Sequence, residues 1–204
     1  FILIGLASCS QINENKSNET ANQNGLPSIR FEKKDAGSTG IEFSNTITEY
    51  DSLNYLNFEY MYNGAGIAVG DINNDGLEDL YLSGNQVSDK LYLNKGDFQF
   101  EDITTKAIGD LAKEGWHTGV LMEDINQDGW LDIYVSRSGP EYLGDSRTNL
   151  CFINNGDLTF TEQSQEFGLL NAAPTTQSLF FDLDNDGDLD LYELNHPYNS
   201  TNGE

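Results

Sequence analysis

The nine residues 71–79, DINNDGLED, place four acidic side chains between two apolar runs, IAV before them and LYL after them. Nearly the same nine letters return as DINQDGWLD at 124–132 and as DLDNDGDLD at 182–190. Like charges gathered at the join of two strand-like segments repel one another unless a positive partner lies among them. This feature constrains the chain to a fold of three similar units, each built around an acidic turn.

Each acidic segment belongs to a larger repeated unit. The first unit runs GIAVG (66–70), acidic segment, DLYLSGN (79–85), DKLYLNKGD (89–97) and FQFEDIT (98–104). The second follows the same order with HTGVLME, DIYVSRSGP, NLCFINNGD and LTFTEQS, and the third begins TQSLFFD and continues DLYELNHP. The acidic segments start at Asp71, Asp124 and Asp182, 53 and then 58 residues apart. These spacings are close to the period of four-stranded propeller blades.

The turns and apolar runs within a unit support the same fold. NKGDF at 94–98 and NNGDL at 154–158 are Gly-centred hairpin signals in which Asn or Gly supplies a positive φ. LYL and IYV are apolar at consecutive positions, which suits strands covered on both faces by neighbouring blades. Helices have little support, and QEFGLLN at 165–171 is at most a short turn. The sequence predicts an all-β fold with blades at 60–105 and 115–166 and a partial blade at 174–204.

A further match concerns the start of this region. FEKKDAGSTGI from Phe31 resembles FEDITTKAIGDL from Phe100 and FTEQSQEFGLL from Phe160, which each finish a unit as its outer strand. Propellers often close by letting one terminus supply the outer strand of a blade built by the other. We therefore expect residues 28–45 to be a closing strand whose partners lie beyond Glu204. The predicted fold is a partial β-propeller: about two complete blades, part of a third and this N-terminal strand.

The acidic segments have the ligand pattern of calcium loops. Calcium prefers six to eight oxygen ligands at about 2.3–2.6 Å, and one short loop can supply most of them. Each segment has Asp at position 1, Asn or Asp at 3, Asp at 5, Gly at 6 and Asp at 9. The predicted side-chain ligands are Asp71, Asn73, Asp75 and Asp79, then Asp124, Asn126, Asp128 and Asp132, then Asp182, Asp184, Asp186 and Asp190. Position 7, occupied by Leu77, Trp130 and Asp188, varies because a backbone carbonyl is the ligand there.

Two other interpretations compete with a calcium loop of this kind. Asn-Asp-Gly also marks ordinary β-turns, but three complete copies favour a metal. An EF-hand shares the pattern up to position 9 but needs a bidentate Glu at position 12 between two helices. That position holds Leu82, Val135 and Glu193. Glu193 alone fits, and its loop lies between SLFF and Pro197, where no helix is expected.

The charge of the chain excludes some partners. With 34 acidic and 10 basic residues, the formal charge of −24 repels phosphate backbones and anionic lipid surfaces, so neither nucleic acid nor direct membrane binding is expected. About three calcium ions would bring the charge to about −18, with the relief placed where the repulsion is greatest. Of the two cysteines, Cys151 lies in the strand-like run LCFI and is expected to be a buried apolar residue.

The N-terminus has features of an export signal. Residues 1–9, FILIGLASC, form an apolar run too short to span a bilayer, and Leu6-Ala7-Ser8-Cys9 resembles the bacterial lipobox, in which the Cys carries diacylglycerol. Residues 10–27 are small and polar and cannot bury a core, which is typical of a flexible tether. The sequence predicts an exported protein that meets the membrane only through a lipid at Cys9.

Residues 28–204 resemble the FG-GAP/VCBS repeat family, calcium-loop β-propellers that include the integrin α-subunit head and cartilage acidic protein-like bacterial proteins. GIAVGDINNDGLEDLYLSGN, KLYLNKGDFQFEDIT and FFDLDNDGDLDLY carry the resemblance. It implies a fragment of a seven-bladed ring, with calcium in the hairpin between the first two strands of a blade, and a role in adhesion or ligand binding. Together with the lipobox, it implies an outer-membrane or cell-surface lipoprotein of a Gram-negative bacterium.

No catalytic constellation can be argued from this sequence. His117 and His196 are its two histidines and neither adjoins a nucleophile, while the loop carboxylates are already explained by the metal. Tyr55, Tyr60, Tyr62 and Trp116 could form a sugar platform, although packing between blades explains them more simply. We expect a non-enzymatic protein that binds an extracellular glycan or protein ligand or acts as a scaffold. Two alternatives stay open: the propeller portion of a polysaccharide-active enzyme whose catalytic residues lie elsewhere, and a structural spacer.

Overall fold

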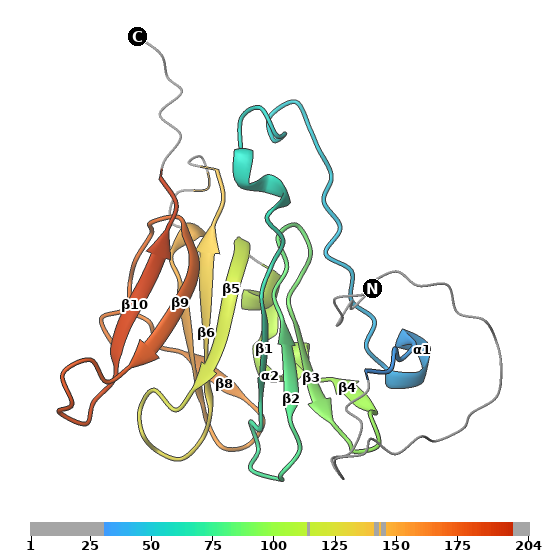
Figure 1. The fold of residues 1–204 in the computed structure, drawn as a ribbon, viewed down its shortest axis with the longest axis vertical. Helices are drawn as coiled ribbons and strands as arrows, with labels where there is room; N and C mark the ends of the chain where they lie inside the picture. The colour runs from blue at the N-terminus through green and yellow to red at the C-terminus, as the bar shows by residue number, and fades with distance from the viewer. Residues whose placement is uncertain (1–30, 114, 141–142, 144–145, 198–204) are drawn as a thin grey trace, which may run out of the picture.

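The computed structural model describes residues 31–113, 115–140, 143 and 146–197 of the 204-residue chain (Figure 1). The predicted signal remnant at 1–9 with Cys9, and the tether at 10–27, lie outside these residues. Within the described part, no helix combines the length and the apolar character that a bilayer crossing requires.

The repeat region forms three antiparallel sheets (Figure 1). The first sheet contains β1 (Ile67–Gly70), β2 (Asp79–Leu82), β3 (Lys90–Asn94) and β4 (Phe100–Asp102) in chain order. The second contains β5 (Trp116–Glu123), β6 (Asp132–Ser138), β7 (Leu150–Asn154) and β8 (Phe160–Glu162), and the third pairs β9 (Thr175–Phe181) with β10 (Asp190–Asn195). The sheets confirm the expected all-β partial propeller, with two four-stranded blades and a two-stranded third unit.

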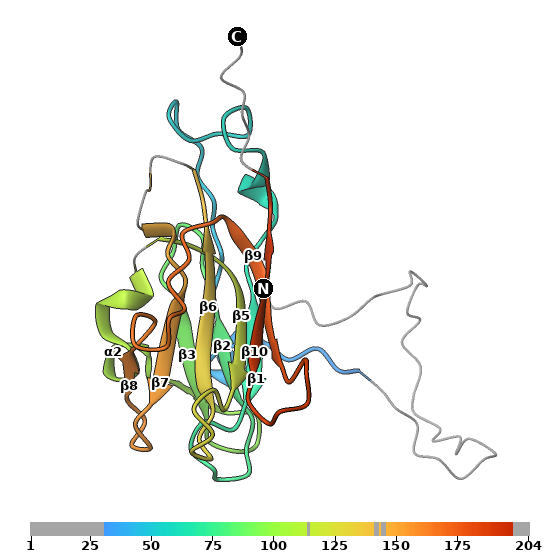
Figure 2. The same ribbon diagram turned by 90° about the vertical axis from the view of Figure 1, so that its left-hand side faces the viewer.

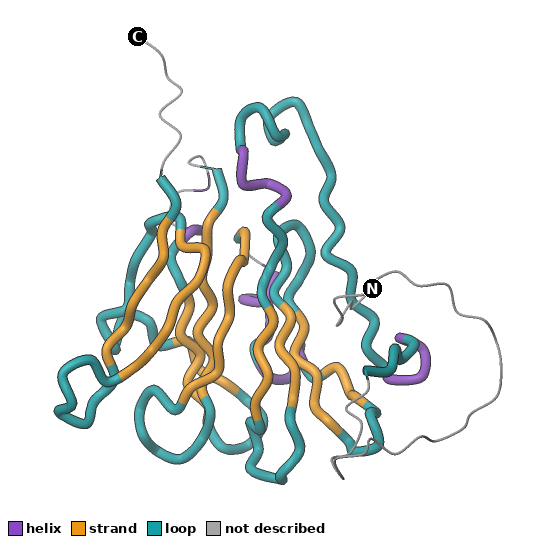
Figure 3. The backbone as a smooth tube through the Cα atoms, in the orientation of Figure 1, coloured by secondary structure: helices purple, strands orange, loops and turns teal. Residues whose placement is uncertain are grey.

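The helical elements are short and lie outside the sheets. Those that lie wholly within the described residues are α1 (Ala36–Thr39), the 3-10 turn η1 (Glu59–Tyr62), α2 (Thr104–Ala107) and the 3-10 turn η2 (Gly109–Lys113). The last two follow β4 and connect the first blade to the second (Figure 3). The stretch 165–171 begins with a hydrogen-bonded turn and contains no helix, as its sequence predicts.

The turns between strands follow the sequence signals. Each acidic loop joins the first two strands of its sheet, and the three loops lie at the same end of the molecule (Figure 1). The Gly-centred hairpins join β3 to β4 and β7 to β8, with Gly96 at φ 82° and Gly156 at φ 73°. Positive φ angles also occur at Phe98 and Leu158, where the sequence alone suggested none.

The apolar core lies between successive sheets. The middle strands of the second blade are buried along their length: all seven residues of β6 and all five of β7 are buried. One core cluster joins Tyr81 and Leu91 of the first blade to Ile133 and Phe152 of the second. Figure 2 shows β5, β6, β7 and β8 of the second sheet following one another across the molecule. Coverage on both faces explains why these strands are apolar at consecutive positions.

The first strands of the three sheets, β1, β5 and β9, approach one another closely because glycines face the contacts. A Cβ added at Gly66, just before β1, would lie 2.7 Å from the carbonyl oxygen of Thr118 in β5. A Cβ added at Gly119 in β5 would lie 2.7 Å from the carbonyl oxygen of Thr176 in β9. Both glycines stand five residues before an acidic loop, and Gln177 holds this position in the third unit.

The segment expected to be a closing strand differs from the prediction. The described residues 31–45 contain no strand, and α1 with its left-handed cap at Gly40 (φ 77°) occupies part of them. The segment packs on the outside of the first blade: Ile41 lies in a buried cluster with Leu82 and Tyr92. A strand needs a partner edge, and the expected partners lie beyond Glu204, so pairing of residues 28–45 with a last blade stays a prediction.

Candidate functional site

The first Asp of each acidic loop organises the turn around its carboxylate. Asp71 accepts hydrogen bonds from the backbone amides of Asp75 at 3.1 Å and Gly76 at 2.7 Å. Asp124 repeats both contacts with Asp128 and Gly129, at 2.9 and 2.8 Å. Asp182 does the same with Asp186 and Gly187, at 3.2 and 3.1 Å. The three loops therefore share one backbone conformation.

Positions 4 and 6 of the loops have the left-handed backbone that this conformation needs. The φ angles are 55°, 59° and 63° at Asn74, Gln127 and Asn185, and 84°, 90° and 95° at the three loop glycines. Glycine at position 6 adopts this geometry without steric cost, whereas most other residues do so at a penalty. The occurrence of glycine in all three loops, as Gly76, Gly129 and Gly187, thus has a conformational reason.

The Asp at position 5 caps the end of the turn. Asp75 accepts the backbone amide of Leu77 at 2.9 Å and Asp128 accepts that of Trp130 at 2.9 Å. In the first two loops the Asn at position 3 donates to the same carboxylate, from Asn73 at 3.0 Å and from Asn126 at 2.9 Å. The side chains at positions 1, 3 and 5 are thereby held on a single turn, and the backbone of position 7 lies at the end of that turn.

The Asp at position 9 has a structural role in the first two loops. Asp79 and Asp132 are fully buried and link their own loop to the third strand of the blade. Asp132 accepts the amides of Ile125 at 3.0 Å and of Asn154 at 2.8 Å. Burial raises the pKa of Asp132 to about 6, against the opposing effect of these hydrogen bonds and with a further increase from the Asp128 charge. A carboxylate in this environment is stabilised by a nearby cation.

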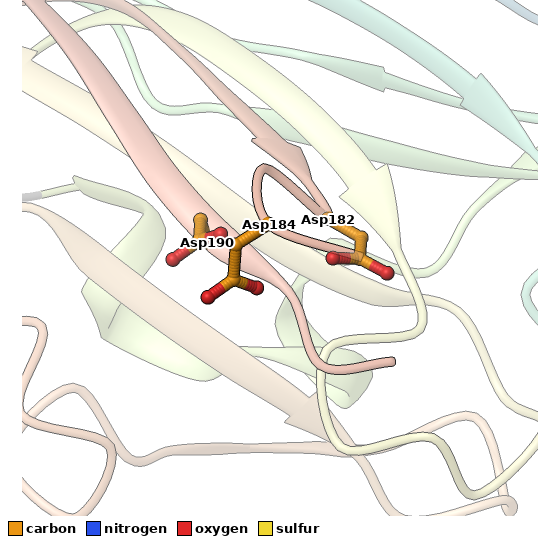
Figure 4. Close-up of side chains that lie close together, drawn as sticks. All are labelled: Asp182, Asp184 and Asp190. Atoms are coloured by element: carbon orange, nitrogen blue, oxygen red, sulfur yellow. The ribbon is translucent and has the colours of Figure 1, made fainter. Parts of the chain in front are cut away.

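The third loop holds three carboxylates close together (Figure 4). Asp182, Asp184 and Asp190 each offer an oxygen, and these oxygens lie within 4.8 Å of one another. Asp184 takes the place of the Asn found at position 3 in the other loops. The pKa of the neighbouring Asp188 is raised, first by its hydrogen bond to Asp186 and then by the charge of that group. The ion pairs found within the described residues all lie outside the acidic loops, so none of them offsets this charge.

Side-chain amides connect each loop to the next. Asn74, at position 4 of the first loop, donates from its side chain to the carbonyl oxygen of Gly129 at 3.0 Å. Gln127, at the same position of the second loop, donates to the carbonyl oxygen of Gly187 at 3.0 Å. The left-handed backbone at position 4 directs these side chains toward the following loop. The three acidic loops are therefore in contact as a series.

A second set of contacts between units was not found from the sequence. Asp89, fully buried before β3, accepts hydrogen bonds from the Tyr81 hydroxyl at 2.5 Å and the Gly84 amide at 2.8 Å, and pairs with His117 Nδ1 of the next blade at 2.6 Å. Its counterpart in the second blade, Asn149, donates to Thr175 at 3.1 Å and to Glu193 at 2.5 Å, both in the third unit. Asp89 and Asn149 each stand directly before the third strand of their unit. This shared position in the repeat was the sequence signal that could have identified them.

Glu193 and Cys151 have packing roles. Glu193 accepts from the Tyr134 hydroxyl at 2.8 Å and from Asn149, so it holds the second blade against the third unit. This explains its acidic side chain without an EF-hand. Cys151 is fully buried beside Tyr134 and Phe180, and burial raises the pKa of its thiol to about 12. The thiol is therefore protonated and unreactive at neutral pH, as expected.

The antiparallel sheets bury their middle strands against one another, and each has an acidic hairpin between its first two strands. These two features define this chain as a β-propeller fragment. Residues 71–135 match the family described as FG-GAP-like repeat, so this part of the chain is an FG-GAP-like repeat.

The similar proteins agree with this assignment. Cartilage acidic protein 1 of Xenopus tropicalis is 33% identical over 138 residues, 66% of this chain and 20% of that protein. The Homo sapiens protein of the same name is 29% identical over 141 residues, 68% of this chain and 20% of its own length. Integrin alpha-8 of Gallus gallus is 32% identical over 152 residues, 63% of this chain and 14% of that protein. The chain thus spans about a fifth or less of the length of these relatives.

Proposed function

We propose that this chain is a calcium-binding propeller segment of an exported, lipid-anchored bacterial surface protein, and that it acts by binding a ligand or as a scaffold rather than by catalysis. The observation that carries the calcium proposal is the common geometry of the three loops. Each gathers carboxylate and amide oxygens on one turn, and the backbone already holds the first and fifth side chains in place. Such a prearranged loop needs little reorganisation to receive a hard cation.

The donor chemistry of the loops fits calcium. Carboxylates, Asn oxygens and a backbone carbonyl are hard ligands, and no sulfur or imidazole is among them. Asp182, Asp184, Asp186 and Asp190, with the carbonyl of Asp188, would hold the ion in the third loop; the corresponding residues would hold it in the first two. The ion would supply positive charge where the carboxylates repel one another, and so would stabilise the hairpins. Sites with dissociation constants of about 10⁻⁴–10⁻³ M would be well occupied in an extracellular medium.

The surface location and the binding role rest on different observations. Export and lipidation are supported by the LASC sequence at residues 6–9 and by the polar stretch that follows it. A non-enzymatic role is supported by the relatives, none of which is named as an enzyme. If Cys9 carries lipid, replacing it in the full-length protein (Cys9→Ser) moves the protein from the membrane fraction to the soluble fraction. Unchanged membrane retention would exclude a lipid anchor at this residue.

Calorimetric titration of the calcium-free protein tests the metal sites. We expect about three ions per chain, one for each acidic loop. Chelation lowers the melting temperature, because each occupied site contributes about 1.4 kcal/mol when calcium is at ten times its dissociation constant. At about 2–4 °C per kcal/mol for a chain of this size, the combined shift is readily measured.

A matched pair of variants controls this experiment. Asp124→Asn removes a loop charge, and we expect it to reduce the calcium stoichiometry by one ion. Asp97→Asn removes a charge from an exposed hairpin residue outside the loops, and it leaves the stoichiometry unchanged. No heat of binding in the wild-type protein, with a melting curve insensitive to chelator, would reject the calcium proposal.

A further inference from the structure

The end of the molecule opposite the acidic loops contains a pocket with a volume of about 320 Å³. Segments far apart in the sequence line it: η1 and the residues after it, the starts of β5 and β9, and His196 after β10. Figure 1 shows η1 and the starts of these strands at the upper end, away from the loops. The pocket is within the size range of small-molecule sites and receives residues from all three units.

Aromatic rings form one side of this pocket. Phe58 and Trp116 are buried and pack edge to face with ring centroids 5.1 Å apart. Tyr60 stacks on the His196 ring at 3.8 Å, and Nε2 of that ring lies 2.6 Å from the Ser138 hydroxyl. Each ring is thus fixed by a neighbour, so the wall is held in shape before any ligand arrives. Preorganised aromatic walls of this kind bind apolar ring faces with little entropic cost.

Polar groups with unused hydrogen-bonding capacity face the same space. Within the described residues, the side-chain amide of Asn63 makes no hydrogen bond. The Gln177 side chain makes one long contact, from Nε2 to the Ser178 carbonyl at 3.4 Å, and among the same residues its oxygen accepts none. Two amides can therefore both donate to and accept from a ligand that carries hydroxyl groups.

The described lining of the pocket carries no charged side chain. No Asp, Glu, Lys or Arg is among these lining residues, although 34 of the 204 residues of this chain are acidic. A cationic ligand would find no carboxylate among them and an anionic ligand no basic partner, while the field of a chain with charge −24 disfavours anions. The lining therefore favours a neutral, hydroxyl-rich molecule with an apolar face.

We propose that this pocket is a binding site for a neutral sugar ring, stacked on the Tyr60 and Trp116 side and hydrogen-bonded by Asn63 and Gln177. This deepens the proposed binding function and rests on it, but it does not depend on the acidic loops. Of the four aromatic residues that the sequence singled out, Tyr60 and Trp116 line the pocket, whereas Tyr55 and Tyr62 do not. A ligand in this position contacts all three units and ties their first strands together.

Tryptophan fluorescence provides the test, because the chain has two Trp residues and only Trp116 lines the pocket. In a Trp130→Phe background at saturating calcium, the protein is titrated with methyl α-D-glucoside, methyl α-D-mannoside, methyl β-D-galactoside and N-acetylglucosamine. We expect a saturable change with at least one of these sugars. Tyr60→Ala weakens its binding about tenfold, the loss expected for an aromatic contact.

Two further variants keep the proposal falsifiable. Gln177→Ala changes an exposed side chain, so it preserves the fold while weakening sugar binding; Tyr55→Ala, an exposed tyrosine outside the pocket, leaves binding unchanged. No saturable response to any of the four sugars, or equal losses in Gln177→Ala and Tyr55→Ala, would overturn the proposal. Calcium titration of the same samples separates the two claims: calcium binding without a sugar response rejects the pocket alone, and the reverse rejects the calcium sites alone.

Discussion

The contact between the first and second blades and the contact between the second blade and the third unit use the same positions of the repeat with different side chains. At the first contact, the buried carboxylate of Asp89 pairs with His117. At the second contact, Asn149 and Thr175 hold these positions, and Glu193 completes the network from the following strand. An ionisable pair in one place is replaced by neutral groups and a partly buried carboxylate in the other.

This difference shows which properties of the repeat are fixed by its geometry. In both places, the residue directly before the third strand of one unit meets the residue seven positions before the acidic loop of the next unit. The backbone therefore sets where consecutive sheets make their polar contact, and the side chains decide how strong it is and whether it titrates. Substitutions at the two contacts should accordingly differ in their cost, and both should cost more than substitutions at the loops.

Asp89→Ala has the largest expected effect. The change leaves His117, the Tyr81 hydroxyl and the Gly84 amide without their common acceptor inside the core. Breaking a buried pair in this way costs about 3–5 kcal/mol of the free energy of unfolding, measured by urea denaturation. The control is Asp110→Ala, which removes an exposed pair with Lys113 and costs little. Equal losses in the two variants would contradict the structural role of the first contact.

Asn149→Ala tests the second contact and is expected to cost less, about 2 kcal/mol, because the side chain removed is an uncharged amide rather than a carboxylate. The side chain of Asn149 accepts the Arg137 amide at 2.7 Å and donates to Thr175 and Glu193. Asn155→Ala, in the exposed hairpin that follows, is the control. A loss equal to that of Asp89→Ala would show that the two contacts do not differ in strength.

The two contacts also show how far the sequence could predict this structure. Local signals predicted the three acidic loops, the hairpins at 94–98 and 154–158 and the doubly covered strands, because each depends on neighbouring residues. Asp89 and Asn149 were missed because their partners in the next unit are 28 and 26 or more residues away. The pocket was missed for the same reason, since Gln177 and His196 join η1 in lining it only after the sheets have packed. The conformation of residues 31–45 could not be predicted from local signals, because a strand forms only where a partner edge is present.

The amide contacts between loops should give a smaller effect. Asn74→Gly and Gln127→Gly remove a hydrogen bond to the next loop while glycine keeps the left-handed backbone, so each costs about 1 kcal/mol or less in chemical denaturation. Asn185→Gly is the matched control, because the described residues offer this side chain no such bond. A similar loss of unfolding free energy in Asn74→Gly and Gln127→Gly, with none in Asn185→Gly, would show that the two contacts between loops are equally strong. The two buried contacts between sheets, in contrast, are expected to differ.

The smallest effect concerns pH. The pKa of His196, at the second contact, is lowered from its ordinary value of 6.5, first by burial and then by the Arg147 charge, although the Pro197 carbonyl opposes the shift. When the pKa of a histidine is lower in the folded state than in the unfolded state, the unfolded state takes up a proton first as the pH falls. The protein therefore loses stability as the pH falls from the unfolded-state pKa toward the folded-state pKa. Stability should therefore decline modestly as the pH falls below about 6.5. The decline, followed by thermal denaturation, should be reduced in His196→Gln; an identical pH profile in that variant would assign it to other groups.

The glycines between the first strands bear on the curvature of a complete ring. Because Gly66 and Gly119 have no side chain, the backbones of β1 and β5, and of β5 and β9, can lie directly against each other. Gln177 places a long side chain at the equivalent position of the third unit. The Gln177 side chain lies against β5, because its oxygen would overlap a Cβ added at Gly119, so the residue at this position of each repeat decides how closely two first strands can approach.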